Sequence, residues 1–242
     1  MEILEKARAD AARVVRVLRR GEFGRIRRGL RGRIDSERRL YGLYRDLEAP
    51  FDVPDPKVPL HIRPLRDEDA PLLLEEPSGE TARSDPAHVQ ARLDLDAGFR
   101  DGYVAVTRND QPCYVQWLIQ PRDNGRMPEI KDGPFAELPP DTVMLHGAYT
   151  PPRFRRLPIM PAAMAIIAGQ GRKLGFRWVV TWVGDDNRSM LRGCRLLGFQ
   201  PYALHTTRWR KFRRNDELTP LQGEWEGGHP VTPDGELVGD RS

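Results

Sequence analysis

Residues 186–199 read DNRSMLRGCRLLGF and follow an apolar run, FRWVVTWV. An asparagine just ahead of a helical pattern is a common N-cap, because its side-chain oxygen accepts a hydrogen bond from a free N–H of the first turn. We therefore expect Asn187 to open a short helix and the run before it to form a buried strand. Gly198 and Phe199 close the pattern, and the glycine comes eleven residues after the asparagine.

A second strand and helix precede this stretch. Residues 142–149 (TVMLHGAY) have a strand pattern, and apolar residues recur at helical spacing from 159 to 174. The connection between them, TPPRFRRLPIM at 150–160, leads into a helix start, where the first N–H groups have no partner and often hold an anion. Such loops usually carry glycines, whereas this one carries prolines and three arginines.

The rest of the chain after position 60 alternates between strand and helix patterns. We expect a strand at 60–65, helices from 67 and around 88–99, strands at 102–107 and 113–119, a loop at 120–140, and a strand pair or one bent strand at 199–212. The two strands after position 100 are expected to form a hairpin, because the turn-rich connector RNDQP lies near their junction.

This order of elements resembles the GNAT acyltransferase fold over about residues 60–213. The resemblance implies an α/β (α+β) class with a mixed central sheet of six to seven strands and flanking helices. In that family a loop of the form Arg or Gln, two residues, Gly, one residue, Gly or Ala holds the coenzyme A pyrophosphate on its backbone N–H groups. Arg155, Pro158 and Met160 stand in those places here. An asparagine followed eleven residues later by Gly-Phe is the other signature, and Asn187 with the GF at 198–199 fits it.

The resemblance implies acetyl-CoA or another acyl-CoA as co-substrate, with no metal. The candidate cofactor-binding residues are Ala148, Tyr149, Thr150, Arg155, Arg156, Leu157, Pro158, Ile159, Met160 and Asn187. Pro158 has no N–H and Met160 adds a side chain, so both departures from the family loop weaken a diphosphate site. The nearby arginines can replace lost contacts. Alternatively, the donor is an acyl group on acyl-carrier protein, whose phosphopantetheine lacks the second phosphate.

Acyl transfer to an amine requires a base for the amine proton and an acid for the departing thiolate. His146 is the candidate base, because a neutral imidazole near pH 7 accepts a proton. Many GNAT proteins place an acidic tyrosine seven residues after the signature asparagine, and Cys194 stands there in this chain. Cys194 is either that acid or a small core residue, and Tyr202 is the other candidate acid.

Further residues are candidates for the acceptor site. Trp117 and Tyr149 either line an acceptor pocket or belong to the core, since aromatic residues of central strands are usually buried. Glu129, Asp132 and Glu137 lie in the loop before the strand at 142–149, where they either attract a cationic amine or are simply solvated.

The charge of the chain is uneven. Residues 1–45 contain fourteen Lys or Arg against six Asp or Glu, a net of +8, whereas the other 197 residues carry 25 against 29, a net of -4. Residues 1–49 are expected to form a basic amphipathic helical arm. It would pack on the rest of the chain or on a second subunit of a homodimer, or lie on an anionic membrane surface. Nucleic acid is not an expected partner, because no recognisable module is present.

The composition argues against several classes of protein. No apolar stretch reaches the roughly 18 residues of a membrane span, and we expect no secretory leader. Two cysteines and five dispersed histidines build neither a disulfide framework nor a metal site. We expect a cytoplasmic protein, peripheral at the inner face of the membrane if the arm binds lipid.

Four parts are expected: a helical arm (1–49), a Pro-rich linker (50–59), a GNAT acyltransferase domain (60–214) and a loosely held tail (215–242). The predicted function is transfer of an acetyl or other acyl group from acyl-CoA to an amine by direct attack in a ternary complex. The acceptor would be a small-molecule or lipid-linked amine. A non-catalytic GNAT-fold protein that binds or scaffolds a partner is the alternative.

Overall fold

A computed structural model describes residues 34–50, 52–74, 85–129, 137–226 and 229–230. The chain divides into two compact units. The smaller unit comprises Met1–Arg39 with His205–Leu218, and the larger unit comprises Leu40–Leu204 with Thr219–Ser242. The helical pattern predicted for 1–33 lies outside the described residues.

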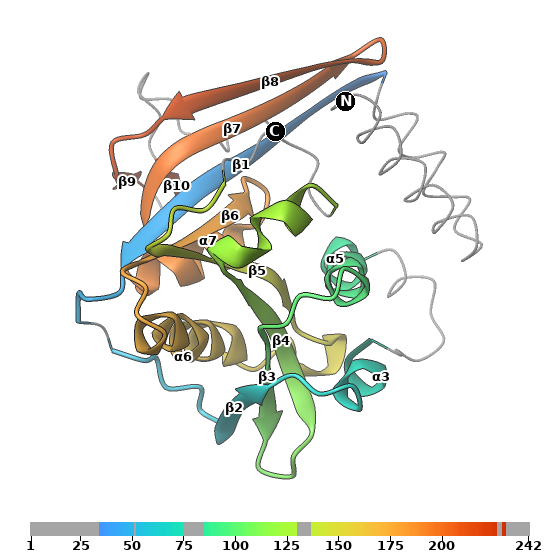
Figure 1. The fold of residues 1–242 in the computed structure, drawn as a ribbon, viewed down its shortest axis with the longest axis vertical. Coiled ribbons are helices and arrows are strands. Elements are labelled where there is room, and N and C mark those ends of the chain that lie inside the picture. The colour runs from blue at the N-terminus through green and yellow to red at the C-terminus, as the bar shows by residue number, and fades with distance from the viewer. Residues whose placement is uncertain (1–33, 51, 75–84, 130–136, 227–228, 231–242) are drawn as a thin grey trace. The chain divides into compact units, whose positions relative to one another are not determined.

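A mixed sheet of eight strands has the order β2-β3-β4-β5-β6-β1-β7-β8 (Figure 1). Its strands are β1 (Asp35–Asp46), β2 (Leu60–Pro64), β3 (Gly102–Thr107), β4 (Pro112–Ile119), β5 (Thr142–Tyr149), β6 (Trp178–Gly184), β7 (Gln200–Arg210) and β8 (Arg213–Pro220). Neighbours from β2 to β5 are antiparallel, as are β6 and β1, whereas β5 and β6 are parallel. Two short strands, β9 (Trp225–Glu226) and β10 (His229–Pro230), pair separately.

Helices cover both faces of the sheet in the larger unit (Figure 1). They are α3 (Asp69–Leu74), α5 (Pro86–Asp96), α6 (Ile159–Lys173) and α7 (Arg188–Leu196), with 3₁₀ helices η1 (Pro121–Glu129) and η2 (Pro152–Phe154). Tyr114 and Leu118 of β4 belong to the apolar cluster of α6 and α7, whereas Val115 and Trp117 belong to the cluster of α3 and α5. Because successive side chains of a strand point to opposite faces, β4 is buried along its whole length.

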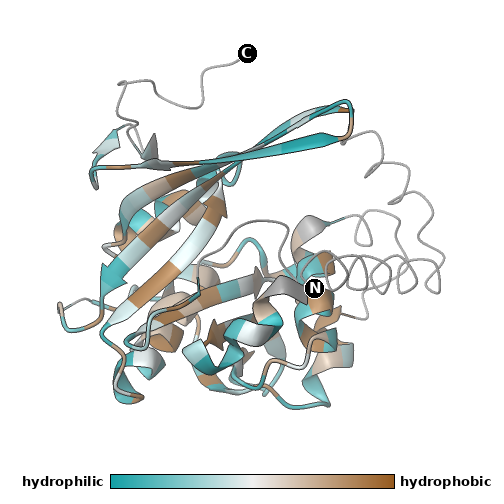
Figure 2. Ribbon diagram, turned by 45° about the horizontal axis from the view of Figure 1, so that its top comes forward, coloured by the Kyte–Doolittle hydropathy of each residue, from teal (hydrophilic) through white to brown (hydrophobic). Residues whose placement is uncertain are grey.

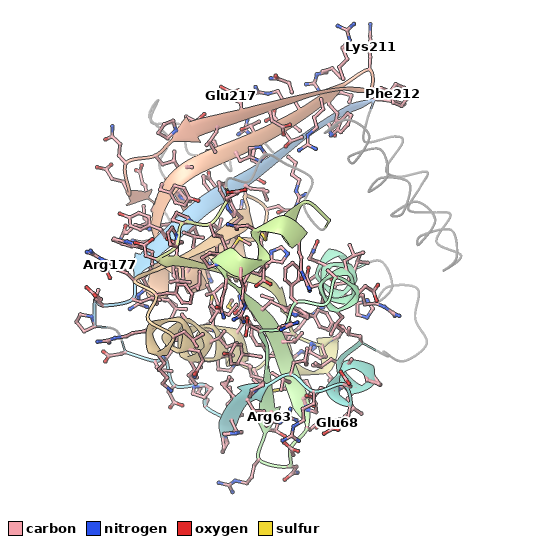
Figure 3. All side chains as sticks on the ribbon, viewed as in Figure 1. Arg63, Glu68, Arg177, Lys211, Phe212 and Glu217 are labelled. Atoms are coloured by element: carbon pink, nitrogen blue, oxygen red, sulfur yellow. The ribbon has the colours of Figure 1, made fainter. Side chains whose placement is uncertain are left out.

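Polar contacts fix the starts of the helices. Asn187 caps α7, and its side chain accepts from the N–H of Met190 at 3.1 Å, as the sequence predicts. Arg63 of β2, labelled in Figure 3, donates to both carboxylate oxygens of Asp69 in α3 at 2.6 and 2.8 Å. The predicted β3–β4 hairpin and the predicted elements at β5, α6, β6 and α7 are all confirmed.

The sheet has more strands than the expected six to seven, because a strand forms where the arm was expected to be helical. Residues 35–46 form β1, which pairs with β6 from Leu40 to Asp46. The helix prediction fails here because Leu40, Leu43, Tyr44 and Leu47 follow the i, i+3, i+4, i+7 spacing of an amphipathic helix. Pairing between two other strands overrides that local pattern, and it buries both faces of the strand centre.

The segment after position 214 is also more regular than expected. Residues 213–220 form β8 rather than part of a loose tail, and a two-residue turn joins β7 to it. Lys211 and Phe212 have positive φ values of 48° and 66°, as a tight hairpin turn requires. Figure 2 shows β8 mostly in hydrophilic colours. Its sequence is polar and lacks an apolar strand pattern, which is why the strand was not predicted. The predicted loop at 120–140 likewise contains η1.

Charged side chains link the strands of the smaller unit. Arg208 contacts Glu37 at 2.9 Å and Glu217 at 2.7 Å, and the Thr207 hydroxyl donates to Asp216 at 2.7 Å. Within the described residues, no helix is long and apolar enough to cross a membrane.

Candidate active site

The parallel strands β5 and β6 part halfway along their length. Their ladder pairs Thr142 with Trp178 and ends where Met144 faces Val180. One more link follows, from the Thr181 hydroxyl to the carbonyl of Leu145 at 3.0 Å. Beyond it, β5 stays paired with β4 as far as Tyr149, and β6 stays paired with β1. Two strand edges therefore diverge past this point, which is an arrangement that accepts an extended ligand carrying amides.

A β-bulge lies in β5 just past this point. Three steps along β5, from His146 to Tyr149, face two steps along β4, so β5 holds one extra residue. Gly147 supplies the bulge with a φ of +66°, and a Cβ at this position would overlap the Asp94 carboxylate. The bulge thus redirects His146, and it requires glycine for both conformational and steric reasons.

His146 contacts a buried carboxylate on the neighbouring helix α5. Its Nε2 lies 3.3 Å from Oδ1 of Asp94, which is 0% exposed. Gln90 donates to the same oxygen at 2.8 Å and lies 3.3 Å from the imidazole Nε2. The tautomer of His146 with its proton on Nε2 donates to Asp94 and leaves Nδ1 as the basic nitrogen, whereas the tautomer with its proton on Nδ1 accepts from Gln90 at Nε2. Among the described residues, Asp94 Oδ2 has no hydrogen-bond partner.

His146 is a residue that the sequence predicts for the site, whereas Asp94 and Gln90 are not. One sequence pattern could have identified Asp94: it repeats at a spacing of three with the buried His88 and Ala91 of α5. A carboxylate on the inward face of a helix needs a partner. His146 is half-buried on the strand that α5 covers, and it provides that partner.

The turn between β5 and α6 has few free backbone donors. The N–H groups of Phe154, Arg155 and Leu157 are bonded to carbonyls within the turn. Pro158 has no N–H, and a proline also follows Met160. The N–H groups of Ile159 and Met160 open α6, where a helix offers unpaired donors. The Ile159 side chain is buried, so only its backbone can face a ligand.

Arg155 is held by the protein on three sides. Its Nε donates to the carbonyl of Thr150 at 3.0 Å, its guanidinium pairs with Asp85, and it lies 5.8 Å from the centre of the Tyr149 ring. Asp85 is also the N-cap of α5, where it accepts from Ala87 at 2.9 Å. Arginine has five N–H donors, so these contacts orient Arg155 and still leave donors for a phosphate. Arg156 and Leu157 are exposed beside it.

The two candidate acids have different environments. Cys194 is fully buried in α7 and burial raises its pKa to about 12, so the core role is the one its position favours. Tyr202 of β7 is half-buried and lines a cavity of about 670 Å³. Burial raises the pKa of Tyr202 to about 12, so its hydroxyl is protonated at neutral pH but is a weaker acid than that of an exposed tyrosine.

The cavity lies on the sheet face that carries His146, because Thr142 and Met144 alternate with it along β5 and line the cavity. Glu137 also lines it. The candidates Trp117 and Tyr149 do not: both are about 1% exposed and belong to the core beneath α5. The side chain of Glu129, and Asp132 entirely, lie outside the described residues. Ala148 and Thr150 are half-buried at the diverging end of β5.

Comparison with known proteins identifies the fold. No protein-family model and no curated protein matches the sequence. A glucosamine N-acetyltransferase region of a fungal multi-domain β-N-acetylglucosaminidase matches 77% of this chain and 22% of its own, with a TM-score of 0.52 and 14% identity. A GCN5-related N-acetyltransferase from Sphaerobacter thermophilus matches 76% of this chain over 56% of its own length, with a TM-score of 0.44 and 15% identity. A Drosophila protein matches 77% of this chain over 56% of its own length, with a TM-score of 0.47 and 15% identity.

This chain therefore spans between 22% and 56% of the length of those structures. The shared architecture with the fungal region is that of the GCN5-related N-acetyltransferases, and it agrees with the predicted fold class.

Proposed function

We propose that this chain, which has the GNAT fold, is an acyltransferase that moves an acyl group from a coenzyme A thioester to an amine nitrogen. One observation carries the proposal: the parted edges of β5 and β6 lie beside a histidine that is held by a buried carboxylate. A thioester supplies an activated acyl carbon, and the amine must lose a proton to attack it. In our proposal His146 would take that proton at Nδ1, and Asp94 would orient the ring through its contact with Nε2.

The donor would be held by groups near the diverging ends of the two strands. The backbone edge of β5 from His146 to Tyr149 would bond the amides of the pantetheine arm. The N–H groups of Ile159 and Met160, with the exposed Arg156, would face the diphosphate. Asn187 uses its side-chain oxygen to cap α7, so its NH₂ group would be available to donate a hydrogen bond to the acyl-CoA.

The thiolate that leaves must be protonated. Tyr202 is our candidate for this step, because it lines the cavity on the same face of the sheet as His146; its raised pKa makes it a weak acid that would donate only as negative charge develops on the sulfur. The balance is then complete: a C–N bond forms, a C–S bond breaks, His146 gains one proton and Tyr202 gives one up.

Binding and turnover test this proposal. At about one hundred times its dissociation constant, acetyl-CoA would stabilise the folded protein by roughly 2.7 kcal/mol, which a thermal-shift measurement detects. Thiol release would follow when an amine is added. If acetyl-CoA and longer acyl-CoAs cause neither a shift nor thiol release with any amine, the non-catalytic alternative gains support.

One observation favours a second candidate donor. In the turn before α6, three N–H groups donate to carbonyls of the turn itself, and Pro158 has no N–H, so the turn offers few hydrogen bonds to a diphosphate. The phosphopantetheine arm of acyl-carrier protein has one phosphate in place of the diphosphate, so it requires fewer N–H donors from this turn. Faster turnover with acyl-carrier protein than with the matched acyl-CoA would support this donor.

A further inference from the structure

Four aromatic rings form a continuous wall of the cavity. Trp178 and Trp182 alternate along β6 and therefore share a face, and Tyr44 of β1 lies opposite Val180 between them. Ring centres are 5.7 Å apart for Tyr44 and Trp178, and 6.0 Å apart for Tyr44 and Tyr202. They are 5.6 Å apart for Trp182 and Tyr202. The Tyr202 ring meets Tyr44 and Trp182 edge to face, and Tyr44 and Trp178 are tilted by 56°, so the four rings pack against one another.

The backbone of β1 is shaped to admit these rings. Gly42 lies opposite Trp182 in the ladder. A Cβ on Gly42 would meet the Trp182 ring at 2.8 Å and the Tyr202 ring at 2.9 Å. The missing side chain lets both rings lie over the strand, so the wall is a built feature of the larger unit.

The cavity suits a cation with an apolar body. Its volume of about 670 Å³ lies within the usual range for small-molecule sites. Among the described residues that line it, Glu137 alone has a charged side chain, and no Lys, Arg or His is present. The faces of aromatic rings carry negative potential and attract cations. An anionic ligand would find no cationic side chain among these lining residues, and a highly polar ligand would find few hydrogen-bonding partners.

The cavity also reaches the proposed reaction centre. Met144 and Val180 line it, and they are the last paired residues before β5 and β6 part. Trp182 lies two residues further along β6, and His146 two residues further along β5. A ligand that fills the cavity therefore has one end at the point where the thioester would arrive.

We propose that the acceptor is an amine with an aromatic or bulky aliphatic body, which binds in this aromatic-walled cavity as its ammonium form. The ammonium releases one proton to solvent before the neutral nitrogen attacks, and His146 takes the second proton as the C–N bond forms. This inference rests on the proposed function, because it identifies the cavity with the acceptor site. The rings would select the apolar body and favour a cationic over an anionic end group, and Glu137 would add attraction for the cation.

Isothermal titration of the full chain with matched probes tests the inference. Tryptamine, indole-3-propionate and ethanolamine compare an aromatic amine, an aromatic acid of similar length and a small amine. Tryptamine is expected to bind at least about tenfold more tightly than either of the others, the scale of discrimination that apolar pockets reach. Trp182→Leu should weaken tryptamine binding by about the same factor. Trp209→Leu is the matched control, because Trp209 does not line the cavity.

A second variant covers the case in which Trp182→Leu fails to fold. Gln222→Lys places a positive charge on an exposed residue that lines the cavity and should also reduce tryptamine binding, whereas thermal shifts with acetyl-CoA should be unchanged. Equal binding of tryptamine and ethanolamine to the wild type, with normal acetyl-CoA binding, would overturn the inference and leave the proposed function standing. Tryptamine binding that depends on Trp182, but without thiol release, would support the ligand class and overturn the proposed function.

One further outcome would assign the cavity differently. If Trp182→Leu weakened octanoyl-CoA binding and left tryptamine binding unchanged, the cavity would hold the acyl chain of the donor. That result would overturn the assignment of the cavity to the acceptor.

Discussion

Nε2 of His146 in β5 lies 3.3 Å from Oδ1 of the buried Asp94 in α5. If Nε2 donates its proton to Asp94, Nδ1 is the ring nitrogen that would accept the substrate proton. His146→Gln is expected to lower kcat of acyl transfer by about 10²–10⁴-fold, the usual contribution of a general base. The rate of thiol release at saturating donor measures this loss, and donor binding should be unchanged.

Asp94→Asn removes the negative charge beside His146 and keeps the size of the side chain. We expect kcat to fall by about tenfold or more, because second-sphere partners of a functional histidine typically contribute about 10–100-fold. Asp96→Asn changes an exposed residue two positions along the same helix and is the control. Equal rates for the two variants, both folded by thermal melting, would show that the carboxylate does not support the histidine.

Gly147→Ala tests the bulge that positions His146. An alanine at a φ of +66° costs about 1–2 kcal/mol on conformational grounds, and its Cβ would also overlap Asp94. Gly175→Ala is the matched control, because its φ is +89° but nothing lies within 4 Å of a Cβ there. Urea denaturation should show a clearly larger loss of unfolding free energy for Gly147→Ala. Equal losses would mean that Asp94 does not confine the bulge.

The sequence predicted the part of the fold whose local and tertiary preferences agree. Asn187 caps α7 as its position suggests, and β5 and α6 keep their predicted periods. Strand β1 was missed because Leu40, Leu43 and Tyr44 are spaced as in a helix, and only the neighbouring strands reveal otherwise.

The candidate site was predictable in the same limited way. His146 stands out as the one histidine on a central strand near the parted edges. Asp94 gains meaning only once α5 packs on β5. The aromatic wall brings together Tyr44, Trp178 and Tyr202 from three separate strands, so no local sequence pattern predicts it.

Asp69 anchors the start of α3 through a paired and nearly buried carboxylate. It accepts two bonds from Arg63 and one from the N–H of Arg66 at 2.9 Å. Asp69→Asn is expected to lower the free energy of unfolding by about 3 kcal/mol, because it leaves the Arg63 charge with only the exposed carboxylate of Asp110, 3.7 Å away, as a partner. Glu68→Gln, at an exposed neighbour shown in Figure 3, should change it by less than about 0.5 kcal/mol. Comparable losses in the two variants would contradict this role.

His205 should make the smaller unit sensitive to mild acid. Burial lowers its pKa below the ordinary 6.5, and Arg214 and Arg38 also lower it, against the opposing charge of Asp216. The unfolded chain then binds a proton near pH 6.5 while the folded chain binds it only at lower pH. Stability from this residue is therefore complete above about pH 6.5 and is lost as pH falls through the folded pKa.

Urea unfolding at pH 7.5 and pH 5 measures this loss, which cannot exceed about 1.4 kcal/mol per pH unit for one group. His205→Gln should show a smaller drop than the wild type. His61→Gln, at an exposed position of β2, should retain the full drop. An unchanged drop in His205→Gln would remove His205 as its source.

Deleting residues 1–33 separates the basic arm from the folded chain, because β1 begins only at Asp35. The deleted segment carries eleven Lys or Arg against four Asp or Glu. Each basic residue near an anionic bilayer contributes about 1 kcal/mol. The full chain is therefore expected to float with vesicles that contain phosphatidylserine, and to be released by high salt because charge screening shortens the attraction. The truncated chain should stay in solution with the same vesicles.

Vesicles of phosphatidylcholine alone provide the control, since they lack the negative surface charge. Equal flotation of the full and truncated chains would refute a membrane role for the arm. Size-exclusion chromatography of the same two chains tests the other partner proposed for it. If the arm joins two subunits, its removal should halve the apparent mass, because the apolar stripes from Ile3 to Leu18 and from Phe23 to Ile34 would be lost or broken. If the arm binds membranes instead, the truncated chain should have the same oligomeric state as the full chain.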